Sequence, residues 1–177
     1  MSKFNWVADT IHSEIGFQIR HLMISNVKGK FANFEASAIA DADFKNAEIN
    51  FTAQVDSLST GDAQRDGHVK SPDFFDAEKF PTITFKSSSF DSGSGKITGD
   101  LTMHGVTLPV TLTVEFGGIA VDPYGQTKSG FTVEGKIKRS DFGLTWGTLV
   151  EAGSVVLADE LKLNIEIQFI KKEEVIS

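Results

Sequence analysis

The chain has 177 residues, enough for one domain with a sizeable hydrophobic core, and 24 acidic against 17 basic residues give a net charge of −7. Nucleic acids and anionic membranes both attract excess basic charge, so the acidic balance argues against either as a partner. The absence of cysteine excludes disulfides, thiolate catalysis, zinc–thiolate sites and iron–sulfur clusters.

The N-terminal residues lack the apolar run of a secretory signal, and no apolar stretch is long enough to span a bilayer. We therefore expect a soluble protein without stable membrane insertion, which is cytoplasmic as the sequence is written. A signal peptide removed before this sequence begins would leave the same residues, and the protein would then be periplasmic.

Aromatic usage is strongly skewed, with 15 Phe against 1 Tyr and 2 Trp. Tyr and Trp carry a polar group that needs a hydrogen-bond partner, whereas Phe contributes only apolar area. This composition predicts an unusually apolar interior, suited to a dry core or to a lipid-like guest.

Alternation of apolar and polar residues, the pattern of a half-buried strand, recurs along nearly the whole chain. In chain order, the alternating stretches cover residues 15–19, 27–40, 49–55, 82–86, 96–103, 108–116, 131–138 and 161–169. Within residues 27–40 the apolar phase changes between Phe31 and Phe34, which predicts a long strand bent by a bulge.

Glycine-rich segments separate these stretches and predict chain reversals. They are residues 91–95, His104-Gly105, Gly117-Gly118 and residues 122–125. About eight strands, each with one apolar face, predict a single all-β domain over residues 1–177, built as an antiparallel barrel or a sandwich. A barrel of this size either fills its interior with side chains or holds one small ligand.

Two segments lack strand periodicity. Residues 62–80 predict a short helix followed by an irregular turn, and residues 140–159 show no sustained period. A long structured insertion between strands usually covers or presents something, so we expect both segments to cover an end of the barrel.

Short motifs in a fixed order along almost the whole chain resemble the YceI-like family of lipid and polyisoprenoid binders. They are Trp6, Asp9 and His12-Ser13; Phe17 and His21; Gly29-Lys30-Phe31; Thr60; Arg65-Asp66-Gly67-His68; Asp73-Phe74-Phe75-Asp76; Phe80-Pro81-Thr82-Ile83 and Phe85; Gly99-Asp100-Leu101-Thr102; His104-Gly105-Val106-Thr107; and Arg139-Ser140-Asp141-Phe142-Gly143.

The resemblance implies a lipocalin-like antiparallel β-barrel of about eight strands with a short helical lid and an elongated apolar pocket. It implies binding of a long isoprenoid, such as a polyprenyl chain, a quinone or a quinone precursor, often in a homodimer. It implies no enzymatic step and no cofactor besides such a bound lipid. Many relatives carry an export signal that this sequence lacks.

The candidate tail-binding residues share the inward phase of the predicted strands or lie just after them. They are Phe17, Ile19, His21, Phe31, Phe51, Phe85, Leu101, Met103, Leu112, Val114, Phe131, Gly135 and Phe142. The candidate head-group or lid residues lie in residues 62–80. They are Arg65, Asp66, His68, Phe74 and Phe75.

We predict different roles for the individual histidine side chains. His21 shares the inward phase, so it either hydrogen-bonds a ligand head group or is satisfied by a backbone carbonyl or a buried water. His104 and His12 precede or occupy turns and are expected to bond nearby backbone. None of the four histidines, His68 included, has a second histidine at the close spacing of a metal site, so we expect no metal.

Arg65 offers a planar fork for a phosphate or carboxylate, but an ion pair with a nearby acid that fixes the lid is the interpretation we favour. Gly99 and Gly135 fall on the inward phase. In a packed barrel they indicate a void or a close backbone approach, and in a carrier they leave room for a guest.

We therefore expect a non-enzymatic carrier of a long isoprenoid, because each methylene that leaves water contributes about 0.8 kcal/mol. One alternative is an enzyme that acts on such a lipid through Arg65 with His68 or His21. The other is an interaction domain with a filled barrel. The sequence has neither the Gly-x-Ser-x-Gly motif of serine hydrolases nor a phosphate-binding loop.

Overall fold

The computed structural model describes residues 2–22, 24–145 and 157–176. These residues form eleven strands, one α-helix and two short 3₁₀ helices. They are β1 (Lys3–Ala8), β2 (Glu14–His21), β3 (Ser25–Phe31), β4 (Phe34–Asp41), β5 (Ala47–Gln54), η1 (Val55–Ser57), β6 (Leu58–Ser59), α1 (Ala63–Lys70), β7 (Thr82–Phe90), β8 (Lys96–Met103), β9 (Val106–Val121), β10 (Thr127–Lys138), η2 (Arg139–Phe142) and β11 (Leu157–Glu174).

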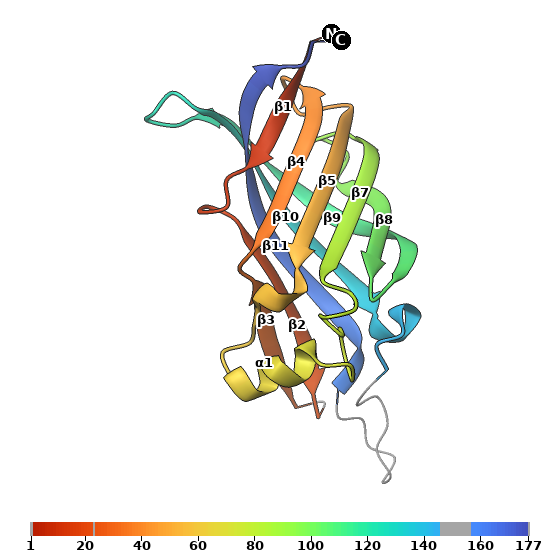
Figure 1. The fold of residues 1–177 in the computed structure, drawn as a ribbon. Coiled ribbons are helices and arrows are strands. Elements are labelled where there is room, and N and C mark those ends of the chain that lie inside the picture. The colour runs from red at the N-terminus through yellow and green to blue at the C-terminus, as the bar shows by residue number, and fades with distance from the viewer. Residues whose placement is uncertain (1, 23, 146–156, 177) are drawn as a thin grey trace.

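Eight of the described strands close into an antiparallel barrel (Figure 1). Their order around the barrel is β1-β4-β5-β7-β8-β9-β10-β11, and β11 pairs back with β1. The predicted all-β barrel is therefore confirmed. The termini lie side by side at one end of the barrel, where the Val175 backbone N–H donates to the Lys3 carbonyl (2.8 Å), and α1 lies at the other end (Figure 1).

The long strand β11 pairs with different strands along one of its sides. Its C-terminal part pairs with β1, with Trp6 opposite Lys171, and its N-terminal part pairs with β2, with Phe17 opposite Leu163. Strands β3 and β6 extend the sheet beyond β2. The wall of the barrel thus continues toward α1 as a second set of strands.

This division corrects the expectation for residues 27–40. They form two strands, β3 and β4, rather than one strand with a bulge, because β3 pairs with β2 while β4 pairs with β1. Between them, Ala32 N donates to the Ser57 carbonyl and the Asn33 carbonyl accepts from Gln54 N. The chain therefore stops pairing with β2 and begins to pair with β1 at the point where its apolar phase changes.

Gly117-Gly118 does not reverse the chain as predicted. Strand β9 continues through it, with Phe116 opposite Phe131 and Gly118 opposite Gly130, so the additional residue makes a β-bulge. Gly118 has a φ of 105°, which glycine adopts without steric cost. The reversal follows at residues 122–125, at the tip of a hairpin that extends away from the barrel (Figure 1).

The lid segment, residues 62–80, has the predicted short helix and irregular turn. Asp62 caps α1 by accepting from the backbone N–H groups of Gln64 (3.0 Å) and Arg65 (3.1 Å). After the helix the chain folds back on it, since Phe75 N donates to the Val69 carbonyl (3.1 Å). Of the second non-strand segment, η2 is described, and residues 146–156 lie outside the described residues.

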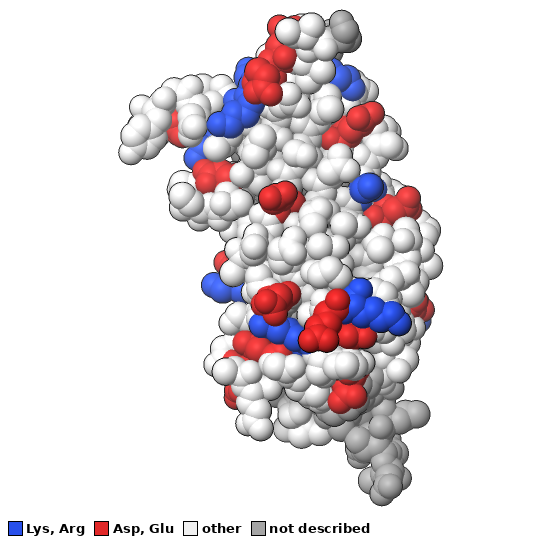
Figure 2. All heavy atoms as spheres, in the orientation of Figure 1, with Lys and Arg blue, Asp and Glu red and all other residues white. Residues whose placement is uncertain are grey.

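The charged side chains of the described surface include both signs. Figure 2 shows acidic and basic side chains interspersed over the described residues of one face. Among the described residues, no helix is long and apolar enough to cross a membrane.

Candidate functional site

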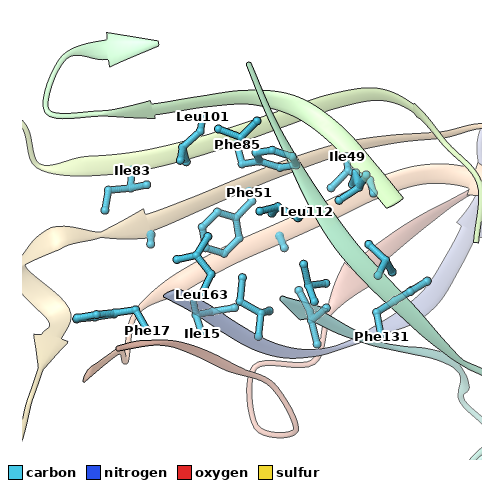
Figure 3. A pocket seen from close by; sticks show the side chains of 18 of the residues that line it. Ile15, Phe17, Ile49, Phe51, Ile83, Phe85, Leu101, Leu112, Phe131 and Leu163 are labelled. Carbon is cyan, nitrogen blue, oxygen red and sulfur yellow. The ribbon is translucent and has the colours of Figure 1, made fainter. Parts of the chain in front are cut away.

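An inner cavity of about 150 Å³ runs along the barrel axis, and all its lining residues are apolar. The inward-facing side chains of β2, β5, β7, β8, β9, β10 and β11 point into it, and Figure 3 shows ten of them labelled. This follows from strand geometry, because alternate residues of each strand face the same side. The cavity therefore offers burial of apolar surface and no hydrogen-bonding side chain.

The end of the inner cavity near the termini is closed by aromatic rings. Phe44, on the turn between β4 and β5, packs against Phe131 (4.9 Å between ring centroids) and Phe169 (5.1 Å), which also line the cavity. Behind it lies Trp6, edge-on to the Phe44 ring at 5.1 Å and fully buried. Trp6 does not line the cavity, so Phe44 separates the two.

An outer cavity of about 210 Å³ lies beneath the lid segment. Three residues, Phe17, Phe75 and Leu161, line both cavities, so the two meet at these side chains. Unlike the inner cavity, the outer one has polar side chains in its wall. They are His21, Thr60, Arg65, His68 and Arg139.

Arg139 places a buried positive charge in this wall. Its side chain is only 3% exposed, and it donates to the carbonyls of Ala158 (3.0 Å), Leu144 (3.0 Å) and Leu157 (3.3 Å). Burial lowers the pKa of Arg139, although the nearby Asp159 carboxylate opposes that shift. The guanidinium therefore joins the start of β11 to the chain after η2.

Thr60 connects the lid segment to the barrel wall. Its hydroxyl donates to Asp66 Oδ1 and accepts from Arg65 Nε (2.8 Å), and its carbonyl accepts from Arg65 Nη2 (2.7 Å). The predicted ion pair of Arg65 with an acid is wrong for the described residues: Arg65 instead bonds Thr60, which Asp66 also bonds. Both charged side chains thus hold the same residue.

His68 and His21 face the outer cavity from opposite elements. His68 Nε2 donates to Asp73 Oδ2 (3.1 Å), and its ring meets Phe74 edge-on at 5.5 Å. His21 lies at the end of β2, where the strand phase predicts an inward side chain. It lines the outer cavity, and among the described residues no hydrogen bond of its imidazole is found.

Most of the predicted site residues line one of the two cavities. The inner cavity has Phe17, Phe31, Phe51, Phe85, Leu101, Met103, Leu112, Val114 and Phe131, and the outer cavity has Phe17, Ile19, His21, Arg65, His68, Phe74 and Phe75, which also lines the inner one. Their contact with a ligand stays a prediction.

Three predicted residues do not line either cavity. Asp66 is turned to Thr60, and Phe142 is buried in the core, where its carbonyl accepts from His104 Nδ1 (3.1 Å). Gly135 does not open space for a guest, because a Cβ there would collide with the Leu112 side chain. At Gly99 a Cβ would meet the backbone of Lys86, so both glycines permit close packing instead.

Sequence reasoning missed several residues of the outer wall. Arg139 continues the inward phase of residues 131–137, so strand parity is the signal that places its side chain in the interior. Thr60, Val69, Leu144 and Leu157 lie in or beside segments without strand periodicity and gave no such signal.

The remaining histidines have structural partners. Neither ring bonds nearby backbone as predicted: His12 Nδ1 donates to the Asp9 carboxylate at Oδ2 (2.7 Å) within its turn, and His104 Nδ1 donates to the distant Phe142 carbonyl (3.1 Å). Among the described residues, no group of three or more His, Cys, Asp or Glu side chains is arranged to hold a metal ion.

The YceI-like domain matches residues 6–169 of the chain. The UPF0312 protein SA2479 of Staphylococcus aureus is 36% identical over 167 residues, which cover 93% of this chain and 96% of that protein. The crystal structure of a Campylobacter jejuni YCEI protein is 40% identical, with a TM-score of 0.72 over 93% of this chain and 96% of that one. A polyisoprenoid binding domain from Saccharophagus degradans, 14% identical, shares the fold with a TM-score of 0.70 over 96% and 99% of the two chains. The chain belongs to the YceI-like family.

Proposed function

We propose that this protein binds and carries a long isoprenoid or similar amphiphile, such as a polyprenyl lipid, a quinone or a quinone precursor. The observation that carries the proposal is the contact of two unlike cavities, a wholly apolar one and one with polar side chains in its wall. Such a pair fits a molecule with an apolar tail and a polar head. The tail occupies the inner cavity, and the head group lies beneath the lid segment.

The energetics of the inner cavity favour such a guest. Each methylene transferred from water contributes about 0.8 kcal/mol, so a prenyl tail binds without polar contacts, although ordering a flexible chain offsets part of this gain. Specificity then depends on the few polar groups near the boundary of the two cavities. His21 lines the outer cavity, and we assign to its imidazole the hydrogen bond with a head-group oxygen.

The fold supports the same class of ligand. The Saccharophagus degradans domain is named for polyisoprenoid binding and has the same barrel. At 14% identity this likeness concerns the fold, so the argument for this chain depends on its own cavity-lining residues.

A carrier is favoured over an enzyme that acts on the lipid. Of the side chains such an enzyme would use, the Arg65 guanidinium is bonded to the hydroxyl and carbonyl of Thr60. His68 bonds Asp73, a pairing found for structural and catalytic histidines alike. An enzyme would turn over a prenyl substrate and lose that turnover, but not binding, in His21→Ala or His68→Ala. Unchanged substrate after incubation with the purified protein would agree with the carrier.

The first test is mass spectrometry of an organic extract of the purified protein, followed by titration of the delipidated protein with prenyl quinones. Leu101→Trp, which fills the inner cavity from β8, should reduce binding at least about tenfold, a loss of about 1.4 kcal/mol. Asp100→Trp is the matched control, because Asp100 is exposed on the outer face of the same strand. Equal binding by a folded Leu101→Trp variant and the control would refute a tail in this cavity.

The homodimer implied by the family resemblance stays a prediction. Light scattering of the purified protein is the measurement that tests it.

A further inference from the structure

We propose that the Phe44 ring is the stop that limits the length of the tail held in the inner cavity. The inference rests on the proposed carrier function and names the tail lengths that the same site accepts. Phe44 is a specificity-determining residue in this view, because it closes the cavity at the end farthest from the lid segment.

The direction in which a tail enters follows from the two cavities. The polar side chains line only the outer cavity, so a head group stays there and the tail passes the boundary at Phe17, Phe75 and Leu161. Its last carbons then point along the barrel axis toward the end that carries the termini. The side chains at that end decide how many carbons fit.

Phe44 is the ring that stands across that end. It is fully buried, lines the cavity, and contacts Phe90, Phe131 and Phe169, whose ring centroids lie 6.4, 4.9 and 5.1 Å away. Trp6 packs on it from the side away from the cavity. The other rings of this cluster come from strands of the wall, whereas Phe44 comes from a turn and reaches inward across the opening.

The backbone that holds the Phe44 ring is fixed independently of the ring. Phe44 has a φ of 59°, in the left-handed region that a bulky residue adopts only when its surroundings impose it. Phe44 N donates to the Asp41 carbonyl (2.9 Å), and the Phe44 carbonyl accepts from Ser92 N (3.1 Å) on the turn between β7 and β8. Ser92 Oγ also donates to the Asp43 carbonyl (2.9 Å). These bonds survive removal of the ring, so a smaller residue at position 44 should open the cavity without moving the turn.

The size of the expected effect follows from carbon counts. A phenylalanine ring has six carbons and an isoprene unit has five, so Phe44→Ala vacates room for about one more unit. Each unit accommodated adds apolar burial, and the affinity should rise at least about tenfold per unit until the tail meets the stop. Beyond that length, additional carbons stay outside the inner cavity and the affinity stops rising.

The experiment titrates all-trans prenyl alcohols that differ by one isoprene unit, delivered from the same detergent, and records affinity against tail length. The wild-type chain should show a length at which affinity stops rising, and Phe44→Ala should move that length by one unit. Phe51→Ala is the matched control, because Phe51 lines the side of the cavity. It should weaken every tail and leave the limiting length where it is.

An unchanged limiting length in a folded Phe44→Ala variant that still binds prenyl alcohols would overturn the stop and leave the carrier function standing. No binding of any tail by the wild-type chain would refute the carrier function and the stop with it. Phe44→Gly is the second variant if Phe44→Ala does not fold, because glycine adopts the φ of this position without strain.

A second, independent measurement keeps Phe44 and detects the end of the tail through the fluorescence of Trp6. In a Trp146→Phe background Trp6 is the single tryptophan, since the chain has 2 Trp. A prenyl analogue with bromine on its last carbon should quench Trp6 fluorescence most strongly at the limiting length, because Trp6 packs directly behind Phe44. Bound analogues that quench equally at all lengths would contradict a tail end at Phe44.

Discussion

The Phe17 ring of β2 lies over Gly29, its cross-strand partner in β3. A Cβ on Gly29 would collide with the far end of that ring, so the ring reaches its position only because residue 29 has no side chain. Phe17 lines both cavities, and its ring packs on Phe31 at 5.5 Å. The missing side chain at residue 29 therefore sets one edge of the boundary between the two cavities.

Gly29→Ala should displace the Phe17 ring toward the cavities, weaken lipid binding and lower the free energy of unfolding by about 1 to 3 kcal/mol, because a buried ring must move to make room for the new methyl group. Parallel titrations and denaturant unfolding check both parts. Gly130→Ala is the control, since a Cβ there meets nothing within 4 Å. Wild-type affinity in Gly29→Ala would show that the ring position does not matter for binding.

Arg139→Met should destabilise the protein by about 3 kcal/mol, because it leaves three carbonyls of the outer wall without their donor. Arg139→Lys should recover little, because a single ammonium cannot reproduce the planar fork. Urea unfolding monitored by circular dichroism measures both. Lys138→Met, at the exposed neighbouring residue, should change stability by less than about 0.5 kcal/mol. A small effect of Arg139→Met would mean that other donors, or water, satisfy these carbonyls.

Stability should fall in acid through Asp9, which joins the β1–β2 turn to the hairpin of β9 and β10. Burial opposes ionisation of Asp9, but hydrogen bonds from Lys128 (2.8 Å) and His12 outweigh it and lower the pKa of Asp9 to about 2. A lowered folded-state pKa gives stability that is present above the ordinary value of 3.8 and is lost as the pH falls through about 2.

Lys128→Met should raise the pKa of Asp9 and lower the stability at neutral pH, and the difference from the wild type should shrink as the pH falls toward 2, because Asp9 becomes protonated in both proteins. Thermal unfolding from pH 2 to pH 7 checks this. In Lys45→Met, which removes the exposed pair with Asp43, the curve should stay that of the wild type. An acid profile unaltered by Lys128→Met would assign the loss of stability to other carboxylates.

Thr60→Val should loosen the lid segment, because it removes the hydroxyl that bonds Asp66 and Arg65. The expected results are faster amide hydrogen exchange in α1 and faster lipid release, with a global stability loss of about 1 kcal/mol. Thr98→Val removes the hydroxyl bonded to Thr111 on the exposed face of β8 and β9 and should leave exchange in α1 unchanged. Equal exchange in α1 for both variants would show that Thr60 does not hold the lid.

Strand phase alone located most of the cavity wall. Alternation with a period of two predicts that Phe17, Phe51, Phe85 and Leu101 face inward, because successive side chains of a strand point to opposite faces. The same reasoning fails at Gly135, since phase says which side a residue faces but not that Leu112 fills the space there. It also fails at residues 27–40, where the phase change marks the boundary between two strands, β3 and β4, that pair with different neighbours.

The sequence by itself determined the strands, their inward faces, the apolar character of the interior and the short helix of the lid segment. These depend on local periodicity, on composition and on capping by Asp62, all of which are properties of neighbouring residues. Only the tertiary structure decided that β11 closes the barrel with β1 and also carries β2, that Arg139 bonds three carbonyls, that Arg65 holds Thr60 and that Phe44 closes the cavity. Each of these depends on contacts between residues distant in sequence or in irregular backbone, where periodicity carries no information.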